Sequence, residues 1–123
     1  MISILMSGCN GKMGQVITRL ADQYDNLKIA AGLDLSDHIK NSYPVFTNIE
    51  KCDVKVDVII DFSSPAAFDA VTGYAVSKKI PLVMATTGLT QLQKNQLEVA
   101  AKAIPVFFSA NMSLGVNLIM VIA

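Results

Sequence analysis

The sequence is poor in the residues that build metal centres and disulfide frameworks. Tryptophan is absent, and there are only one histidine and two cysteines among 123 residues. Cys9 and Cys52 lack the close spacing of metal ligands or of a disulfide scaffold, and free thiols favour a reducing compartment. The single histidine, His38, lies in a polar, irregular stretch, where we expect a surface residue rather than a catalytic base.

The sequence also lacks an excess of charge of either sign. Ten basic residues balance ten acidic ones, which argues against a nucleic-acid or anionic-membrane partner. No apolar run reaches the roughly 18–20 residues of a membrane helix. Residues Met1 to Ser7 lack the basic start of a secretory signal. With 52% apolar residues and 16% charged ones, we expect a soluble, cytoplasmic domain.

What the sequence does contain is an alternation of strand and helix patterns. Short apolar runs predict strands at residues 2–7, 27–33, 56–62, 81–86 and 105–110, with at most a short strand around Val45. Helical patterns begin at residues 11, 65, 90 and 113, and the third of them ends near Ala103. The alternation predicts an α/β fold in which helices cover both faces of a parallel sheet.

Local signals support two of these helices and the helical face of a third. Ser64 and Pro65 are typical of an N-cap followed by proline at the first helical position. Thr90 and Gln93 have the spacing of a capping box. An apolar face of the first helix is indicated by residues at spacings of four, three and four, namely Met13, Ile17, Leu20 and Tyr24.

The end of the sequence is unusually apolar. Residues Val116 to Ala123 form a helical pattern without a cap, a basic last turn or a polar face. We therefore expect residues 1–112 to form one domain, and residues 113–123 to begin a helix that leads into a C-terminal domain absent from this sequence.

A glycine-rich turn joins the first strand to the first helix. Gly8 is expected to permit the tight turn, Gly11 the close approach of a phosphate, and Gly14 the contact between helix and strand. Free N–H groups and the helix dipole favour a pyrophosphate at such a helix N-terminus. Asn10 stands where the usual fingerprint has its second glycine, and asparagine tolerates a positive φ. Alone, the three glycines are also compatible with an ordinary tight connection.

Asp34 makes the dinucleotide interpretation stronger. It follows the second strand, twenty residues after Gly14, where a carboxylate is expected to bind the hydroxyls of the adenosine ribose. The next residue is Leu35 rather than an arginine for a 2′-phosphate, which favours NADH. NADPH stays possible, because Lys12 or Lys40 could reach such a phosphate.

Three more strand ends are expected to meet the cofactor, since ligands of open α/β sheets lie beyond the carboxyl ends of the strands. Each is also compatible with a polar turn that caps a helix. They are residues 61–65, 85–88 and 109–117.

Taken in order, these segments resemble one family. They are Gly8-x-x-Gly11-Lys12-Met13-Gly14, Asp61-Phe62-Ser63-x-Pro65, Ala85-Thr86-Thr87-Gly88 and Ala110-Asn111-x-Ser113-x-Gly115-Val116-Asn117. The ordered set resembles the 4-hydroxy-tetrahydrodipicolinate reductases (dihydrodipicolinate reductases) of lysine and diaminopimelate biosynthesis, over essentially the whole sequence. The resemblance implies a Rossmann-type, doubly wound parallel sheet and an NAD(P)H-dependent oxidoreductase.

The resemblance also implies a role for individual residues. Thr87 borders the small-molecule substrate, and Asp34 binds the adenosine ribose. The implied pyrophosphate contacts are Gly8, Cys9, Asn10, Gly11, Lys12 and Met13. The implied contacts toward the nicotinamide are Thr86, Thr87, Ser109, Ala110, Asn111 and Met112, and further implied contacts with the cofactor are Phe62 and Ala85.

In that family a second domain supplies the catalytic histidine-rich motif and lysine, together with most contacts of a homotetramer. We therefore expect no catalytic residue in this sequence, which should bind cofactor but turn over nothing by itself. The sequence departs from the family at Asn10 and Ala85, where glycine is usual, and at Leu35, where some members have arginine. Two alternatives stay open: a free-standing NAD sensor, and the nucleotide domain of another two-domain dehydrogenase of amino-acid metabolism.

Overall fold

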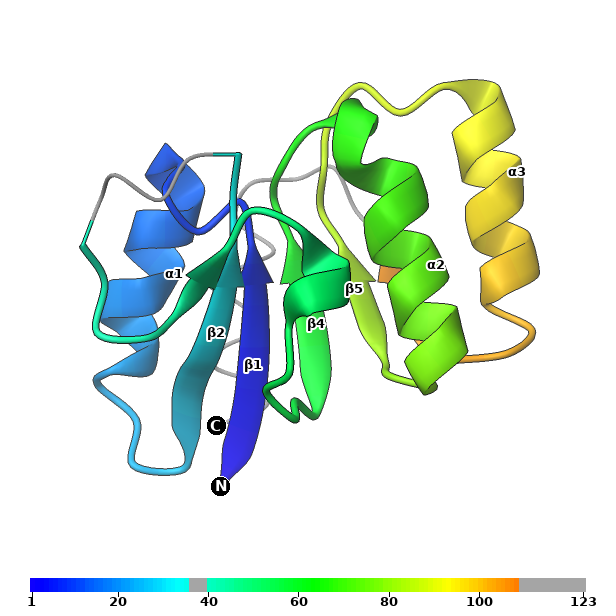
Figure 1. Cartoon of the computed structure of the whole chain (residues 1–123). Helices are drawn as coiled ribbons and strands as arrows, with labels where there is room; N and C mark the ends of the chain where they lie inside the picture. The colour runs from blue at the N-terminus through cyan, green and yellow to red at the C-terminus, as the bar shows by residue number, and fades with distance from the viewer. Residues whose placement is uncertain (36–39, 109–123) are drawn as a thin grey trace.

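Six parallel strands form one sheet in the part of the chain that the computed structural model describes, residues 1–35 and 40–108 (Figure 1). The strands are β1 (Ile2–Ser7), β2 (Leu27–Leu33), β3 (Val45–Phe46), β4 (Val58–Asp61), β5 (Leu82–Met84) and β6 (Val106–Phe108). The helices are α1 (Lys12–Ala21), α2 (Phe68–Lys78) and α3 (Gln91–Ala100), with the 3₁₀ turns η1 (Ile49–Lys51) and η2 (Pro65–Ala67).

The strand order is β3-β2-β1-β4-β5-β6, which is that of a Rossmann-type sheet. The chain runs outward from β1 to β3 and then returns to the other side of β1 with β4. Crossovers therefore leave β1 and β4 in opposite directions, and a crevice opens beyond their carboxyl ends. Ser7 and Asp61 are paired at that edge of the β1–β4 ladder. The predicted α/β class and parallel sheet are confirmed.

Two apolar layers cover the two faces of the sheet. On one face, Ile4 and Ile60 pack in a cluster with Ile17 of α1. On the other face, Leu5 and Ile59 pack in a cluster with residues of α2 and α3. This division follows from the strands, because successive side chains point to opposite faces and both faces are buried by helices (Figure 1).

The first two strands have the predicted bounds, and the short strand predicted around Val45 is present. The strands predicted at 56–62 and 81–86 are shorter in the structure. The fourth strand is confined to 58–61, and the third helix ends at Ala100 rather than near Ala103. The capping box of that helix is confirmed, since Thr90 Oγ1 accepts from the Gln93 N–H at 3.1 Å and Gln93 Oε1 from the Thr90 N–H at 2.9 Å. Ser64 is a cap by position only, because it opens η2 without a side-chain hydrogen bond.

The predicted face of α1 packs together as expected, although the helix itself ends at Ala21. Ile17 is buried, and Met13, Leu20 and Tyr24 are half-buried against the same cluster. Tyr24 lies beyond the end of the helix, where a turn brings it back to that cluster.

Several predictions fall on residues outside the described ranges. These are the surface position of His38, the nicotinamide contacts Ser109–Met112 and the final helix at 113–123. Within the described part, Cys9 and Cys52 are free, as predicted, and the structure shows that both are buried. No helix there is both long and apolar enough to span a membrane.

Candidate dinucleotide site

The turn after β1 is built around glycines that cannot carry a side chain. Gly8 has a φ of +84°, and a Cβ on it would lie 2.8 Å from the Phe62 carbonyl oxygen. A Cβ on Gly14 would meet the Gly8 carbonyl oxygen and would lie 2.7 Å from the Cys9 Cα. These two glycines have the predicted roles, one in the tight turn and one in close packing of α1 against it. Gly11 is less confined, since its Cβ would lie 3.3 Å from the Gly8 carbonyl oxygen.

The prediction that Asn10 adopts a positive φ in place of a glycine is wrong. Among non-glycine residues of the described ranges, only Lys79 has a positive φ, so Asn10 does not need conformational tolerance. It is held instead by hydrogen bonds. The Asn10 N–H donates to Asp34 Oδ2 at 2.9 Å, and Asn10 Oδ1 accepts from Asn41 Nδ2 at 2.8 Å. The position therefore links the glycine turn to β2 and to the segment before β3.

The N-terminus of α1 has the properties of an anion site. Its N-cap is Gly11, which offers no side-chain hydrogen bond, and the first turn contains no acidic residue. The first N–H groups of a helix have no acceptor within it, and the helix dipole places partial positive charge there. No side chain of the helix itself neutralises that end. A phosphate group could do so.

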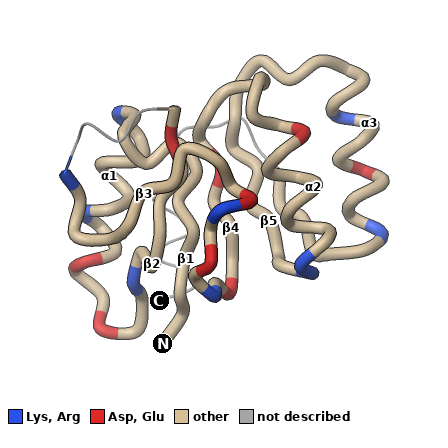
Figure 2. The backbone as a smooth tube through the Cα atoms, in the orientation of Figure 1, with Lys and Arg blue, Asp and Glu red and all other residues tan. Residues whose placement is uncertain are grey.

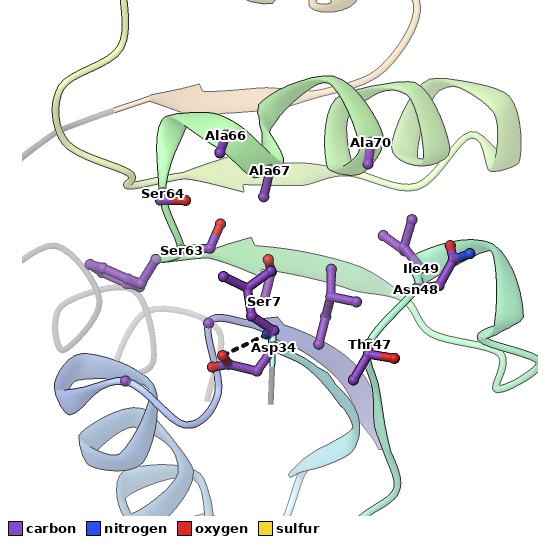
Figure 3. Close-up of a pocket in the computed structure, with 15 residues that line it drawn as sticks. Ser7, Asp34, Thr47, Asn48, Ile49, Ser63, Ser64, Ala66, Ala67 and Ala70 are labelled. Carbon is purple, nitrogen blue, oxygen red and sulfur yellow. Dashed lines mark hydrogen bonds between the residues drawn. The ribbon is translucent and has the colours of Figure 1, made fainter. Parts of the chain in front are cut away.

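Asp34 stands at the rim of the same turn. Its Oδ2 accepts from the Asn10 N–H at 2.9 Å, and its Oδ1 accepts from the Leu35 N–H at 2.7 Å (Figure 3). Each oxygen keeps a further lone pair, since a carboxylate oxygen can accept two hydrogen bonds. The half-buried carboxylate is therefore fixed in direction and still able to accept from a pair of hydroxyls.

A cavity of about 580 Å³ lies beyond the carboxyl ends of β1, β2 and β4. In Figure 3, Asp34 and Ser7 lie on one side of it, and Ala66, Ala67 and Ala70 lie opposite. The volume falls in the range of small-molecule sites. The cavity is lined by Ser7, Gly8, Gly11, Leu33, Asp34, Leu35, Thr47, Asn48, Ile49, Phe62, Ser63, Ser64, Ala66, Ala67 and Ala70.

The cavity brings together four of the residues predicted from the sequence: Gly8, Gly11, Asp34 and Phe62. The side chain of Cys9 is buried in the core beneath α1, and burial, with the charge of Asp34, raises the pKa of its thiol to about 11. At neutral pH that thiol is protonated and unreactive.

The other predicted contacts among residues 1–35 and 40–108 do not line this cavity. Lys12 and Met13 form the first turn of α1, with Lys12 exposed and Met13 half-buried against the core. Beyond β5, Ala85 and Thr86 are buried, and Thr87 is exposed.

The part of the cavity wall that follows β3 was not predicted from the sequence. Thr47, Asn48 and Ile49 follow β3, and they reach the cavity because β3 lies beside β2 at the edge of the sheet. The sequence does contain one local pattern there, an asparagine that caps a helical turn. Asn48 caps η1 by accepting from the Glu50 N–H at 3.0 Å. Asparagine two residues before a charged residue is too common a pattern to locate a site.

The charged side chains around the cavity determine which ligands it can bind. Asp34 is charged, and none of the described lining residues is lysine or arginine. Elsewhere, basic and acidic residues are interspersed over the described surface (Figure 2). The cavity therefore offers main-chain N–H groups and helix dipoles to an anion, but no cationic side chain from the described residues.

Comparison with known proteins agrees with this geometry. The family described as "Dihydrodipicolinate reductase, N-terminus" matches residues 2–112. A 4-hydroxy-tetrahydrodipicolinate reductase of Clostridium novyi is 42% identical over 119 residues, which are 97% of this chain and 47% of that protein. The corresponding protein of Clostridium tetani is 43% identical, with the same coverage. The chain spans about half the length of these curated relatives.

Solved structures show the same fold. A dipicolinate-bound dihydrodipicolinate reductase from Paenisporosarcina sp. TG-14 is 30% identical, with a TM-score of 0.71 over 82% of this chain and 43% of that one. An aspartate dehydrogenase of Thermotoga maritima, 14% identical with a TM-score of 0.61 over 87% of this chain and 44% of that one, shares the fold alone. The family match and the curated relatives show more than a shared fold. They show that the chain belongs to the dihydrodipicolinate reductase family, whose N-terminal part it contains.

Proposed function

We propose that this chain binds NADH and is the cofactor domain of a 4-hydroxy-tetrahydrodipicolinate reductase in lysine and diaminopimelate biosynthesis. The family membership supports the reaction, and the relatives carry that name. The observation that carries the binding role is the shared cavity. Gly8 and Gly11 beside the α1 N-terminus, together with the Asp34 carboxylate, line the same space of about 580 Å³.

The residues present fit a dinucleotide. The pyrophosphate would lie against the uncapped N-terminus of α1, where Gly11 leaves room for it. The adenosine ribose hydroxyls would donate to Asp34, whose oxygens are already oriented by the N–H groups of Asn10 and Leu35. When bound, the reduced nicotinamide supplies a hydride. The protein's part is to bind and orient the dinucleotide.

Two features favour NADH over NADPH. A 2′-phosphate would lie beside the Asp34 carboxylate, and the two negative charges would repel each other. Leu35, the residue that follows, is 89% exposed and cannot pair with a phosphate. Neither Lys12 nor Lys40 lines the cavity.

The remaining assignments rest on the family resemblance. We propose that Thr87, exposed beyond β5, borders the substrate, and that Ser109–Met112 position the nicotinamide through their main chain. The resemblance also supports a homotetramer in the cytoplasm, with the catalytic histidine motif and lysine supplied outside this sequence. Sedimentation of the native protein tests the assembly.

Nuclear magnetic resonance of the ¹⁵N-labelled chain during titration with NADH tests the site. We expect the largest shifts at Gly8, Gly11, Asp34 and Ala67, and small ones along α3. Gly11→Val should abolish binding, because its side chain would enter the phosphate position. Gly73→Ala is the matched control, since Gly73 lies outside the cavity and a Cβ there meets nothing within 4 Å. Unchanged NADH affinity in a folded Gly11→Val variant would refute the phosphate site.

A further inference from the structure

A buried polar cluster lies at the crevice between β1 and β4, and we define it as Ser7, Asp61, Ser63 and Thr86. Ser7 and Asp61 are neighbours across the β1–β4 ladder, and both are completely buried. Thr86, just beyond β5, is 2% exposed. Buried carboxyl groups are rare without a cationic partner, so Asp61 needs a physical explanation.

The two oxygens of Asp61 have different surroundings. Oδ1 accepts from the Ser63 N–H at 2.9 Å and from Ser63 Oγ at 2.5 Å. Oδ2 is buried and has no hydrogen-bond partner among the described residues, and the same holds for Ser7 Oγ. Burying a carboxylate with one oxygen that accepts no hydrogen bond costs free energy of folding. A carboxylic acid could carry its proton on that oxygen, and the other buried oxygen without a partner, Ser7 Oγ, belongs to the residue paired with Asp61 across the β1–β4 ladder.

The groups around Asp61 do not supply a compensating charge. Burial raises the pKa of Asp61, and the hydrogen bonds from the N–H and hydroxyl groups of Ser63 lower it by less. No ionisable side chain from the described parts of β1, β5, η2 or α2 contributes to this pKa. Hydroxyl groups stabilise a neutral acid as well as a carboxylate, and burial favours the neutral form.

Asp61 is connected to both turns that follow the central strands. Its side chain holds Ser63, which lines the cavity. Its carbonyl oxygen accepts from the Ala85 N–H at 3.0 Å and from Thr86 Oγ1 at 3.3 Å. Ser7 and Ser63 both line the cavity (Figure 3). A substitution at Asp61 would therefore shift the wall of the cavity, although Asp61 itself does not line the cavity.

We propose that Asp61 is a positioning residue, which as a neutral carboxylic acid donates Oδ2–H to Ser7 Oγ and holds the Ser63 wall of the dinucleotide cavity. The effect of Asp61 on NADH binding rests on the proposed function, whereas the protonation state of Asp61 does not. The amide of Asn imitates this acid, because its oxygen can accept from Ser63 while its NH₂ group donates to Ser7.

The protonation state is measured directly by ¹³C resonances of the aspartate carboxyl groups in the full chain, with Asp61→Asn identifying the Asp61 signal. An aspartate with the ordinary pKa of about 3.9 loses its proton over the pH range around that value, and we expect the Asp61 signal to show the protonated form up to a higher pH. An Asp61 signal that titrates together with the others would overturn the proposal.

Stability against pH gives a second readout. The folded-state pKa of Asp61 lies above the unfolded value of 3.8, so the folded chain binds the proton more tightly. Its contribution is fully present below that unfolded value and is lost as pH rises through the folded pKa. This loss should disappear in Asp61→Asn and persist in Asp57→Asn. Asp57 is a matched control, because it is exposed and accepts from the Ser3 N–H at 2.8 Å at the other end of β4.

Binding then tests the positioning role. Asp61→Asn should keep the melting temperature and the NADH affinity. Asp61→Ala should weaken NADH by roughly tenfold, the scale of one lost buried hydrogen bond, or fail to fold. Loss of folding or binding in Asp61→Asn would overturn the role of a neutral acid. If the wild-type chain bound no NADH, the proposed function would fail, and the carboxyl spectra would still decide the protonation of Asp61.

Discussion

At the scale of single residues, Asp34 is the residue that we propose to select the dinucleotide. Its carboxylate is held by two main-chain N–H groups, those of Asn10 and Leu35, and so its orientation is fixed before any ligand binds. A preorganised acceptor contributes more to binding than a mobile one, because no side-chain entropy is lost on binding.

Replacing Asp34 with Ala should weaken NADH binding about 10- to 100-fold, since hydrogen bonds to a charged group contribute about 1.5–3 kcal/mol. Calorimetry measures the affinity. Asp53→Ala, which removes an exposed carboxylate outside the cavity, is the control and should leave the affinity unchanged. Equal affinities in the wild type and Asp34→Ala would show that Asp34 does not contact the ribose.

Replacing Leu35 with Arg should move the preference toward NADPH. The exposed position beside Asp34 would then carry a guanidinium within reach of a 2′-phosphate. We expect the ratio of NADPH to NADH affinity to rise by about tenfold, equivalent to about 1.4 kcal/mol. A ratio that stays constant would remove the argument that residue 35 selects the cofactor.

At the scale of elements, glycine is required in the turn after β1 but is not required by packing in helix α2. Gly14 is required, because any side chain would meet the backbone of Gly8 and Cys9. Gly73 lies in the middle of α2, where it is exposed and has open space around it. Glycine in a helix interior costs conformational entropy without a packing gain there.

Gly73→Ala should therefore stabilise the chain by roughly 0.5–1 kcal/mol, the difference in helix propensity between the two residues. Urea denaturation followed by circular dichroism measures the change. Gly14→Ala is the contrasting variant and should destabilise the fold. A Gly73→Ala chain that is less stable than the wild type would mean that α2 is not an ordinary helix at this position.

At the scale of the whole molecule, the sequence was most informative where structure is local. The runs at residues 2–7 and 27–33 are apolar along their length because the strands are buried on both faces, and their bounds agree with the structure. The capping box at Thr90 was equally predictable, because its partners lie three residues apart.

The cavity was predictable on one side only. Gly8, Gly11 and Asp34 belong to one strand–helix–strand unit, so their spacing locates them together. Ile49 and Ala70 reach the same space through the order of the sheet, which no local pattern encodes. Asn10 illustrates the same limit, since its partner Asn41 is thirty-one residues away and its φ is not positive.

Calorimetric titration of the wild-type chain with NADH and, separately, with NADPH tests the central claim most directly. We predict saturable binding of one NADH per chain, with weaker binding of NADPH, because the cavity offers a helix N-terminus and one carboxylate but no cationic side chain from its described lining. Absence of heat with both dinucleotides, from a chain that melts cooperatively, would contradict the claim that this cavity is a cofactor site.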